Sequence, residues 1–408
     1  MLSEELIFDV STNQSITFEE LMVRLNSEAF YYEKWCYTSF YDFLVNFLKA
    51  LINGRDITLL DKDFSNEELA KLGYSNSILI KHTLASTSPN ITDKASLINK
   101  LTNSKSSVTF FTSGTTGIPK RIIHTIPTLT RMIRVGNNYK DNVWAIAYNP
   151  THIAGVQVIL QALFNGNRMV YAFETSGNEL KRSIIERGIT HISATPTFYR
   201  LLVSEKTSFP AIKRITLGGE KSDARLHKLL SISFPNSKIN NIYASTELGS
   251  LFVTDCENFV VPASLADKVQ VMEDELMVHS SLLSWQIEDE WYKTGDLVQV
   301  INTFPLTFKF QSRKNEMINT GGYKVNPNEV EEAIRSFKEV REVRVFGKPN
   351  SVLGNILCAE IVFYPDNHLE NNEIFSRLKN ILQEFKIPRI IKVLDKIEVT
   401  RTGKLSRK

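Results

Sequence analysis

A run of small hydroxyl-bearing residues and glycines has the composition of an anion-binding loop. It follows residues 106–111, whose β-branched and aromatic side chains predict a strand. Glycine lets the backbone approach an anion closely, and hydroxyls and successive backbone N–H groups donate hydrogen bonds to it. We therefore predict that this loop, with the lysine after it, holds the phosphates of a nucleotide. Its candidate residues are Thr112, Ser113, Gly114, Thr115, Thr116, Gly117 and Lys120.

The spacing of this loop differs from that of a Walker loop, in which a lysine directly follows the second glycine and a hydroxyl residue follows the lysine. Here Ile118 and Pro119 separate Gly117 from Lys120, and Arg121 comes next. An ordinary Thr/Gly turn would also explain a short polar loop. The order Ser-Gly-Thr-Thr-Gly-x-Pro-Lys, however, resembles the phosphate loop of the adenylate-forming superfamily, which includes acyl-CoA and aryl-CoA synthetases, luciferases and peptide-synthetase adenylation domains.

A second motif lies at residues 243–247, which read YASTE and resemble the superfamily's Tyr-Gly-x-Thr-Glu. The resemblance implies that Tyr243 stacks on adenine and that Thr246 contacts the α-phosphate. It places Mg²⁺ on Glu247, and a hard carboxylate suits that ion. Ala244 stands where the superfamily usually has glycine.

Two further segments resemble nucleoside-binding parts of the superfamily. Gly218, Gly219 and Glu220 follow a predicted strand and resemble the loop that runs along the adenine. Residues 291–297 read WYKTGDL, and the resemblance implies that Asp296 accepts hydrogen bonds from both ribose hydroxyls. Taken alone, either segment could be an ordinary turn.

The last third of the chain resembles the superfamily's hinge and lid. In the hinge motif, Arg313 would bind ribose or phosphate and the hinge residue falls on Asn315. Gly322 would line the channel for a thiol arm. The closing segment places Lys404 where a lysine reaches the α-phosphate and the substrate carboxylate, although a charged tail is also typical of a solvated chain end.

By this resemblance the chain is an AMP-forming ligase whose cofactors are ATP, Mg²⁺ and CoA. A carboxylic acid and ATP would give an acyl-adenylate and pyrophosphate, and thiol attack would then give a thioester and AMP. Lys404 and Thr246 would act in the first step. Two alternatives stay open: the thiol could be the phosphopantetheine of an acyl carrier protein, or the chain could be a catalytically degenerate nucleotide-binding protein.

The acid is predicted to bind beside residues 150–155, which read PTHIAG. His152 lies where many acyl- and aryl-CoA ligases carry a histidine, and we expect it to gate the carboxylate site, although a core histidine is an alternative. The loop contains no acidic residue to pair with an α-ammonium. This argues against amino acids and for an aryl or medium acyl acid. The loop and the chain length resemble those of 2-succinylbenzoate-CoA ligases, which would suit an aromatic or dicarboxylic acid.

The elements that position these residues are predicted from the alternation of strands and helices over residues 141–260, which indicates an α/β fold. Ligands of such sheets bind at the carboxyl ends of the strands. Residues 1–108 have a mostly helical pattern and are abbreviated compared with the superfamily. We expect a large N-terminal α/β domain over residues 1–311 that binds ATP and the acid. A hinge at residues 312–316 and a small mobile α+β lid over residues 317–408 follow, with the active site between the two domains.

Composition excludes several classes of function. The 408 residues carry a formal net charge of +3, which gives no argument for a nucleic-acid partner. Three well-separated cysteines suit a reducing compartment. We see no signal peptide and no apolar run of the roughly 18 residues that a membrane span needs. We therefore expect a cytoplasmic enzyme that acts on a small carboxylic acid.

Overall fold

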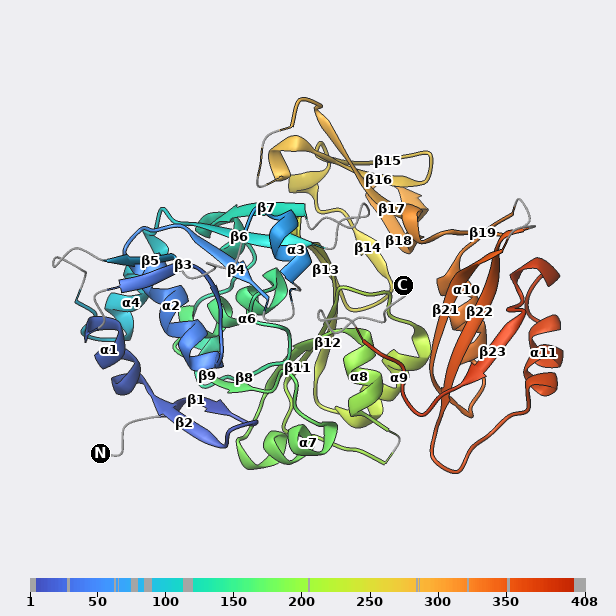
Figure 1. The fold of residues 1–408 in the computed structure, drawn as a ribbon, viewed down its shortest axis with the longest axis horizontal. Helices are drawn as coiled ribbons and strands as arrows, with labels where there is room; N and C mark the ends of the chain where they lie inside the picture. The colour runs from blue at the N-terminus through green and yellow to red at the C-terminus, as the bar shows by residue number, and fades with distance from the viewer. Residues whose placement is uncertain are drawn as a thin grey trace.

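The computed structural model consists of two sheets of eight and five strands with helices between and around them, a separate five-stranded antiparallel sheet, and a C-terminal unit that stands to one side (Figure 1). The structure describes residues 5–27, 30–61, 64, 66–74, 80–83, 90–112, 120–204, 206–283, 285, 287–320, 323–350 and 353–399. The α/β fold with a large N-terminal part and a smaller C-terminal part confirms the predicted fold class.

The larger sheet has eight strands in the order β13-β12-β11-β10-β8-β9-β1-β2. The six inner strands are parallel, while the edge strands β13 and β2 are antiparallel to their neighbours. The carboxyl ends of the inner strands therefore meet at one edge, where ligands bind in such sheets. The strands are β1 (Glu5–Asp9), β2 (Gln14–Thr17), β8 (Val143–Ile146), β9 (Arg168–Tyr171), β10 (His191–Ala194), β11 (Arg214–Gly218), β12 (Lys238–Ser245) and β13 (Gly249–Thr254).

The second large sheet has five strands in the order β5-β3-β4-β6-β7. The sequence predicts residues 1–108 to be mostly helical with a short strand at residues 57–61; the structure has that strand as β4, but β1, β2, β3 and β5 also form there and correct the prediction. Residues 30–36 form the aromatic-rich strand β3, and aromatic residues favour strands as well as helix cores. The strands are β3 (Phe30–Cys36), β4 (Ile57–Leu60), β5 (Ile80–Thr83), β6 (Ser107–Thr112) and β7 (Lys120–Thr125).

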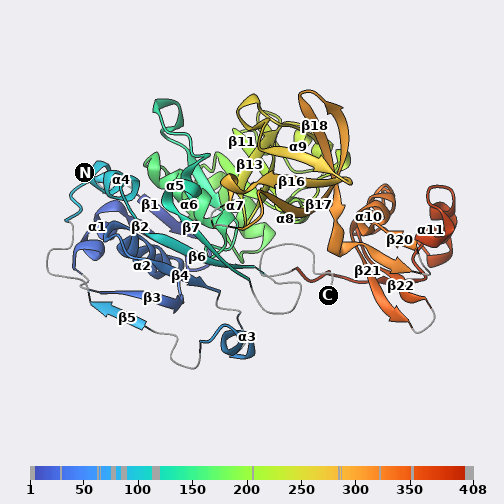
Figure 2. The same ribbon diagram turned by 90° about the horizontal axis from the view of Figure 1, so that it is seen from above.

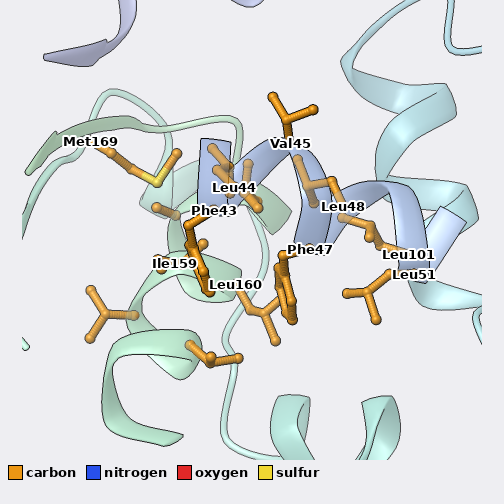
Figure 3. Close-up of a cluster of buried hydrophobic side chains, with 14 of the residues drawn as sticks. Phe43, Leu44, Val45, Phe47, Leu48, Leu51, Leu101, Ile159, Leu160 and Met169 are labelled. Atoms are coloured by element: carbon orange, nitrogen blue, oxygen red, sulfur yellow. The ribbon is translucent and has the colours of Figure 1, made fainter. Parts of the chain in front are cut away.

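Helix α2 (Phe40–Ile52) fills the core between the two large sheets together with α6 (Ile153–Phe164). The Ser39 side chain caps α2 by accepting the Asp42 N–H. Phe43, Leu44 and Phe47 of α2 lie against Ile159 and Leu160 of α6 (Figure 3). The other helices of this part are α1 (Phe18–Ser27), α3 (Asn66–Lys71), α4 (Lys94–Thr102) and α5 (Ile126–Thr130).

The opposite face of the eight-stranded sheet is covered by α7 (Gly177–Glu186), α8 (Pro196–Leu202) and α9 (Ala224–Ser233). Strand positions that alternate along β8, β10 and β11 are apolar on this face, as a buried sheet surface requires. The two faces of the sheet therefore belong to separate apolar clusters.

The five-stranded antiparallel sheet and the C-terminal unit complete the chain. The sheet has the order β14-β18-β17-β16-β15 and the unit is built on a three-stranded sheet, β21-β22-β23. Figure 2 shows the unit at one end of the molecule. These elements are β14 (Asn258–Val260), β15 (Val269–Met272), β16 (Glu275–His279), β17 (Trp291–Thr303), β18 (Leu306–Arg313), β19 (Ile318–Thr320), β20 (Tyr323–Val325), α10 (Pro327–Arg335), β21 (Val340–Asn350), β22 (Gly354–Phe363), α11 (Asn371–Lys379) and β23 (Ile390–Val393).

A buried charge network joins the C-terminal unit to the larger part. Arg200 of α8 pairs with Asp223 at 2.7 Å, and Arg335 of α10 lies 3.8 Å from the same carboxylate. Arg335 also pairs with Glu331 at 3.1 Å and with Glu342 at 3.3 Å. Removing one partner from such a network would leave buried charge unpaired, so the network favours this arrangement of the two parts.

The helices that the structure describes include none that is long and apolar enough to cross a membrane.

Candidate functional site

The predicted phosphate loop connects the two strands of a hairpin. Thr112 of β6 pairs with Lys120 of β7 in antiparallel register. The chain therefore leaves the loop on a second strand, whereas a Walker loop leads from a strand into a helix. Of the predicted residues, Ser113, Gly114, Thr115, Thr116 and Gly117 lie outside the described part of the chain, as do Gly322 and Lys404.

Lys120 lies against two aromatic rings of the antiparallel sheet region. Its ammonium is 4.9 Å from the centre of the Trp285 ring and 5.9 Å from that of Tyr292. Burial, and then the charge of Glu247, raises the pKa of Tyr292 to about 12. The hairpin thus brings a cation close to the segment in which the ribose-binding Asp296 was predicted.

Six of the predicted nucleotide-binding residues line one pocket at the carboxyl ends of β11 and β12. They are Gly219, Glu220, Tyr243, Ala244, Asp296 and Arg313. The first four come from the eight-stranded sheet and its loops, and the last two come from β17 and β18. Residues that are far apart in the sequence, and that the resemblance assigned to the nucleotide, therefore line one pocket, here named the nucleoside pocket.

Asp296 is the centre of the polar contacts in this nucleoside pocket. Its carboxylate, which is 2% exposed, accepts a hydrogen bond from the Tyr243 hydroxyl at 2.5 Å and another from Arg313 Nε at 3.0 Å. Burial, together with the Asp296 charge, raises the pKa of Tyr243 far above its usual range. The phenol therefore stays protonated and donates.

The hydrogen-bonding groups and the aromatic surface of this pocket fit a nucleoside. An ionised carboxylate can accept about four hydrogen bonds, so the two made by Tyr243 and Arg313 leave acceptor sites for two ribose hydroxyls. The buried ring of Tyr243 offers an aromatic surface beside them. Gly219, which has φ +84°, occupies a backbone conformation that favours glycine at the turn after β11.

Glu220 has a structural partner as well as its place in the nucleoside pocket. Its carboxylate accepts the backbone N–H of Thr197 at 3.0 Å, at the first turn of α8. Glu220 therefore ties the predicted adenine loop to the neighbouring helix. Next to it, Tyr148 donates a hydrogen bond to the Gly218 carbonyl at 3.3 Å, which holds the start of the same loop.

The turn that carries Thr246 and Glu247 is held by a histidine that the sequence analysis missed. His124 of β7 contacts the Thr246 carbonyl through Nε2 at 2.6 Å and the Thr128 hydroxyl through Nδ1 at 3.1 Å. Its side chain is fully buried, and burial lowers the pKa of His124. The neutral imidazole can donate from Nε2 to the carbonyl and accept at Nδ1. Arg131 supports the same turn by donating to the Leu248 carbonyl.

Glu247 fits the predicted role of a Mg²⁺ ligand. Glu247 is half-buried and lies two residues after the end of β12, and within the described residues its carboxylate forms no ion pair. A hard carboxylate without a protein partner can bind a cation that also contacts phosphate. Across the described ranges, no group of three or more metal-binding side chains is present.

His152 lies at the start of α6 and its orientation is fixed by Asp61. The His152 Nε2 atom is 3.2 Å from the Asp61 carboxylate, which also accepts a hydrogen bond from Asn149 at 2.8 Å. Gly155 makes this packing possible, because a Cβ atom there would lie 2.2 Å from the Asn149 carbonyl oxygen. The His152 side chain is 22% exposed and lines a cavity, so it is not an enclosed core histidine.

That cavity has a volume of about 270 Å³ and extends between α6 and the eight-stranded sheet. The predicted site residues His152, Thr246 and Gly218 line it. Gly219 and Ala244 line both this cavity and the nucleoside pocket. An acid in the cavity would therefore lie next to a nucleotide in the pocket.

Comparison with family models identifies two matches. The model described as AMP-binding enzyme matches residues 49–273, and the model described as AMP-binding enzyme C-terminal domain matches residues 329–404. Together these matches include the predicted Tyr243, Thr246 and Glu247 in the first part and Lys404 in the second.

Curated relatives and a solved structure agree with these matches. The chain is 25% identical over 329 residues to a 2-succinylbenzoate–CoA ligase of Listeria monocytogenes, a match that covers 74% of this chain and 69% of the relative. It is 24% identical over 402 residues to the enzyme of the same name from Staphylococcus aureus, covering 87% of this chain and 75% of the relative. The structure of O-succinylbenzoate coenzyme A synthetase from Bacillus subtilis, in complex with ATP and magnesium ion, has a TM-score of 0.71 at 19% identity and covers 99% of this chain and 96% of that one.

Proposed function

Because the chain belongs to the AMP-binding enzyme family and is an AMP-forming ligase, we propose that it joins an aryl or medium acyl carboxylic acid to CoA through an acyl-adenylate. ATP and Mg²⁺ are the nucleotide and metal of the first step. CoA is the thiol of the second step, and AMP and pyrophosphate are released.

The observation that carries the proposal is the junction of the two binding spaces. The acid cavity and the nucleoside pocket meet at Gly219 and Ala244, and Thr246 lies on the cavity wall beside that junction. A carboxylate at the junction would face the α-phosphate of a nucleotide whose ribose is held by Asp296. Such positioning converts a reaction between two anions into a step within one complex.

Lys120 and Mg²⁺ would supply the electrostatic part of the step. Lys120 approaches from the hairpin, and Glu247 would hold Mg²⁺ at the turn after β12. These charges would stabilise the negative charge that builds on the α-phosphate during attack. Lys404 is proposed to supply a further cation in the first step.

The charges of the acid cavity argue against amino acids. Its lining residues include arginine and histidine side chains, while aspartate and glutamate are absent from the described lining. The Asp61 carboxylate pairs with His152 and is not part of that lining. An α-ammonium would therefore be buried without a counter-charge, which costs on the order of several kcal/mol.

A screen of carboxylic acids tests the proposal. Purified protein is incubated with ATP, Mg²⁺, CoA and one acid from a panel of aryl, medium acyl and proteinogenic amino acids, and AMP and thioester are quantified. We expect acid-dependent AMP release with aryl or medium acyl acids and equal amounts of thioester. Best activity with an amino acid would refute the assigned substrate class. AMP release in which a carrier protein's phosphopantetheine replaces CoA, with CoA inactive, would refute the assigned thiol.

A further inference from the structure

The face of the eight-stranded sheet that lies under α6 is unusually polar for a surface covered by a helix. Side chains of alternate strand residues point to the same face. On β10, β11 and β12 these positions carry the polar side chains His191, Ser193, Arg214, Thr216 and Asn240, and all of them line the acid cavity. The intervening positions of the same strands belong largely to the apolar cluster on the other face.

Two of these polar groups have no hydrogen-bond partner among the described residues. Asn240 and Thr216 are 5% and 6% exposed, and within the described residues their side chains have no hydrogen-bond partner. Buried polar groups are nearly always paired, so unpaired ones that face a cavity indicate a polar ligand or water there. A cavity for a purely hydrocarbon chain would not need them.

The far end of the cavity is positively charged. Arg214 is the first residue of β11 and Gly218 is the last, so their backbones are about 13 Å apart along the strand. Gly218 adjoins the nucleotide junction, and Arg214 therefore marks the opposite end. Arg134 lines the same cavity, and among the described residues no carboxylate pairs with either guanidinium.

The neighbouring histidine adds no positive charge at this end. The His191 ring packs against Trp144 with ring centres 4.7 Å apart. Burial, and then the charges of Arg214 and Lys213, lowers the pKa of His191 to about 4. The imidazole is therefore neutral at physiological pH, and the arginines supply the positive charge.

We propose that the substrate carries a second anionic group, which Arg214 binds at the far end of the cavity while the reacting carboxylate lies at the junction near Gly219. The inference rests on the proposed function and narrows its substrate class to extended dicarboxylic acids. Thr216 and Asn240 would bind polar atoms between the two carboxylates. Arg214 acts here as a specificity residue, because it is remote from the reacting atoms.

Two matched pairs of acids test this inference. In the aromatic pair, 2-succinylbenzoate is compared with 4-oxo-4-phenylbutanoate, which lacks the ring carboxylate. In the linear pair, suberate is compared with octanoate, which has the same number of carbon atoms. The variant is Arg214→Gln, and the control is Lys213→Gln, which removes an exposed cation adjacent in sequence but outside the cavity lining. Thermal unfolding of both variants verifies that they are folded.

For at least one pair, we expect the unaltered protein to prefer the diacid at least tenfold in kcat/KM for acid-dependent AMP formation. Arg214→Gln should abolish that preference and leave the rate with the monoacid within about threefold, whereas Lys213→Gln should keep it. Equal use of diacid and monoacid in both pairs, or an equal loss for both acids in Arg214→Gln, would overturn the inference while leaving the ligase proposal intact.

If no AMP is formed, calorimetric titration of the protein with the same acids tests the anion site at Arg214 separately from the ligase function. Tenfold tighter binding of a diacid, lost in Arg214→Gln, would support the anion site even where the ligase proposal had failed. Absent or equal binding of all four acids would overturn it.

Discussion

Replacement of Asp296 by asparagine tests how the nucleoside pocket holds ribose. The substitution keeps the size of the side chain and removes its charge. In the structure this carboxylate is 2% exposed and receives hydrogen bonds from the Tyr243 hydroxyl and from Arg313 Nε. An asparagine offers one acceptor oxygen in place of two, so it can no longer serve both protein donors and two ribose hydroxyls.

The expected magnitudes follow from these contacts. A hydrogen bond to a charged group contributes roughly 1.5–3 kcal/mol, compared with about 1 kcal/mol for a neutral one. The charge attraction between Asp296 and Arg313 adds little to the free energy of unfolding, because the Arg313 side chain is 42% exposed. We therefore expect Asp296→Asn to lower the free energy of unfolding by about 1–2 kcal/mol. The affinity for ATP should fall about 10- to 100-fold, which corresponds to about 1.4–2.8 kcal/mol.

Calorimetric titration with ATP and Mg²⁺ measures this affinity without knowledge of the acid. The matched control is Tyr243→Phe, which removes one donor to Asp296 but keeps the carboxylate charge and an aromatic ring. Its ATP affinity should change no more than about threefold, or roughly 0.7 kcal/mol. A folded Asp296→Asn protein that binds ATP within twofold of the unaltered protein would refute the assignment. Equal losses in the two variants would also do so.

Three further perturbations test other parts of the site. His124→Leu leaves the Thr246 carbonyl without its histidine partner, so we expect the free energy of unfolding in urea to fall by about 1–3 kcal/mol. We also expect kcat to fall about tenfold, because the turn that carries Thr246 and Glu247 loses its support. An unchanged kcat would contradict this role of His124. Lys404→Ala should abolish acid-dependent pyrophosphate exchange but spare thioester formation from a supplied acyl-adenylate, and equal loss of both would show that the lysine is not specific to adenylation. Burial alone would raise the pKa of Asp223, but Arg200 and Arg335 outweigh it and hold the pKa at about 2. Because this value lies below the unfolded value of about 3.9, the stabilisation is complete above about pH 4 and is lost as the pH falls towards 2. In urea unfolding, Asp223→Asn should remove about 2–3 kcal/mol of the change in the free energy of unfolding between about pH 4 and pH 2. An unaltered pH dependence in this variant would refute the stabilising role of the Asp223 charge.

Local sequence patterns predicted much of the α/β part because each element there carries its own signal. The helix over residues 153–164 and the strand over residues 168–171 begin and end as their apolar patterns indicate. The N-terminal strand β3 was missed because its aromatic side chains fit either a helix core or a strand, and only pairing between strands decides the matter.

In the candidate site too, residues within local motifs were predicted, whereas residues held by distant partners were not. Tyr243, Asp296 and Arg313 were predicted to serve one nucleoside from the order of their motifs, and the structure brings them into one pocket. His124 and Asp61 were missed because their partners are 122 and 91 residues away in the sequence. A histidine on the buried face of a strand was the available signal for His124, as the burial alternation of β7 indicates.

Product analysis in the absence and presence of CoA tests the central claim most directly. The protein is incubated with ATP, Mg²⁺ and the best acid of the screen, and the products are identified by mass spectrometry. Without CoA, we predict pyrophosphate and an enzyme-bound acyl-adenylate; added CoA should convert the adenylate into equal amounts of thioester and AMP. Formation of ADP and phosphate, or cleavage of ATP that does not depend on the acid, would contradict the account.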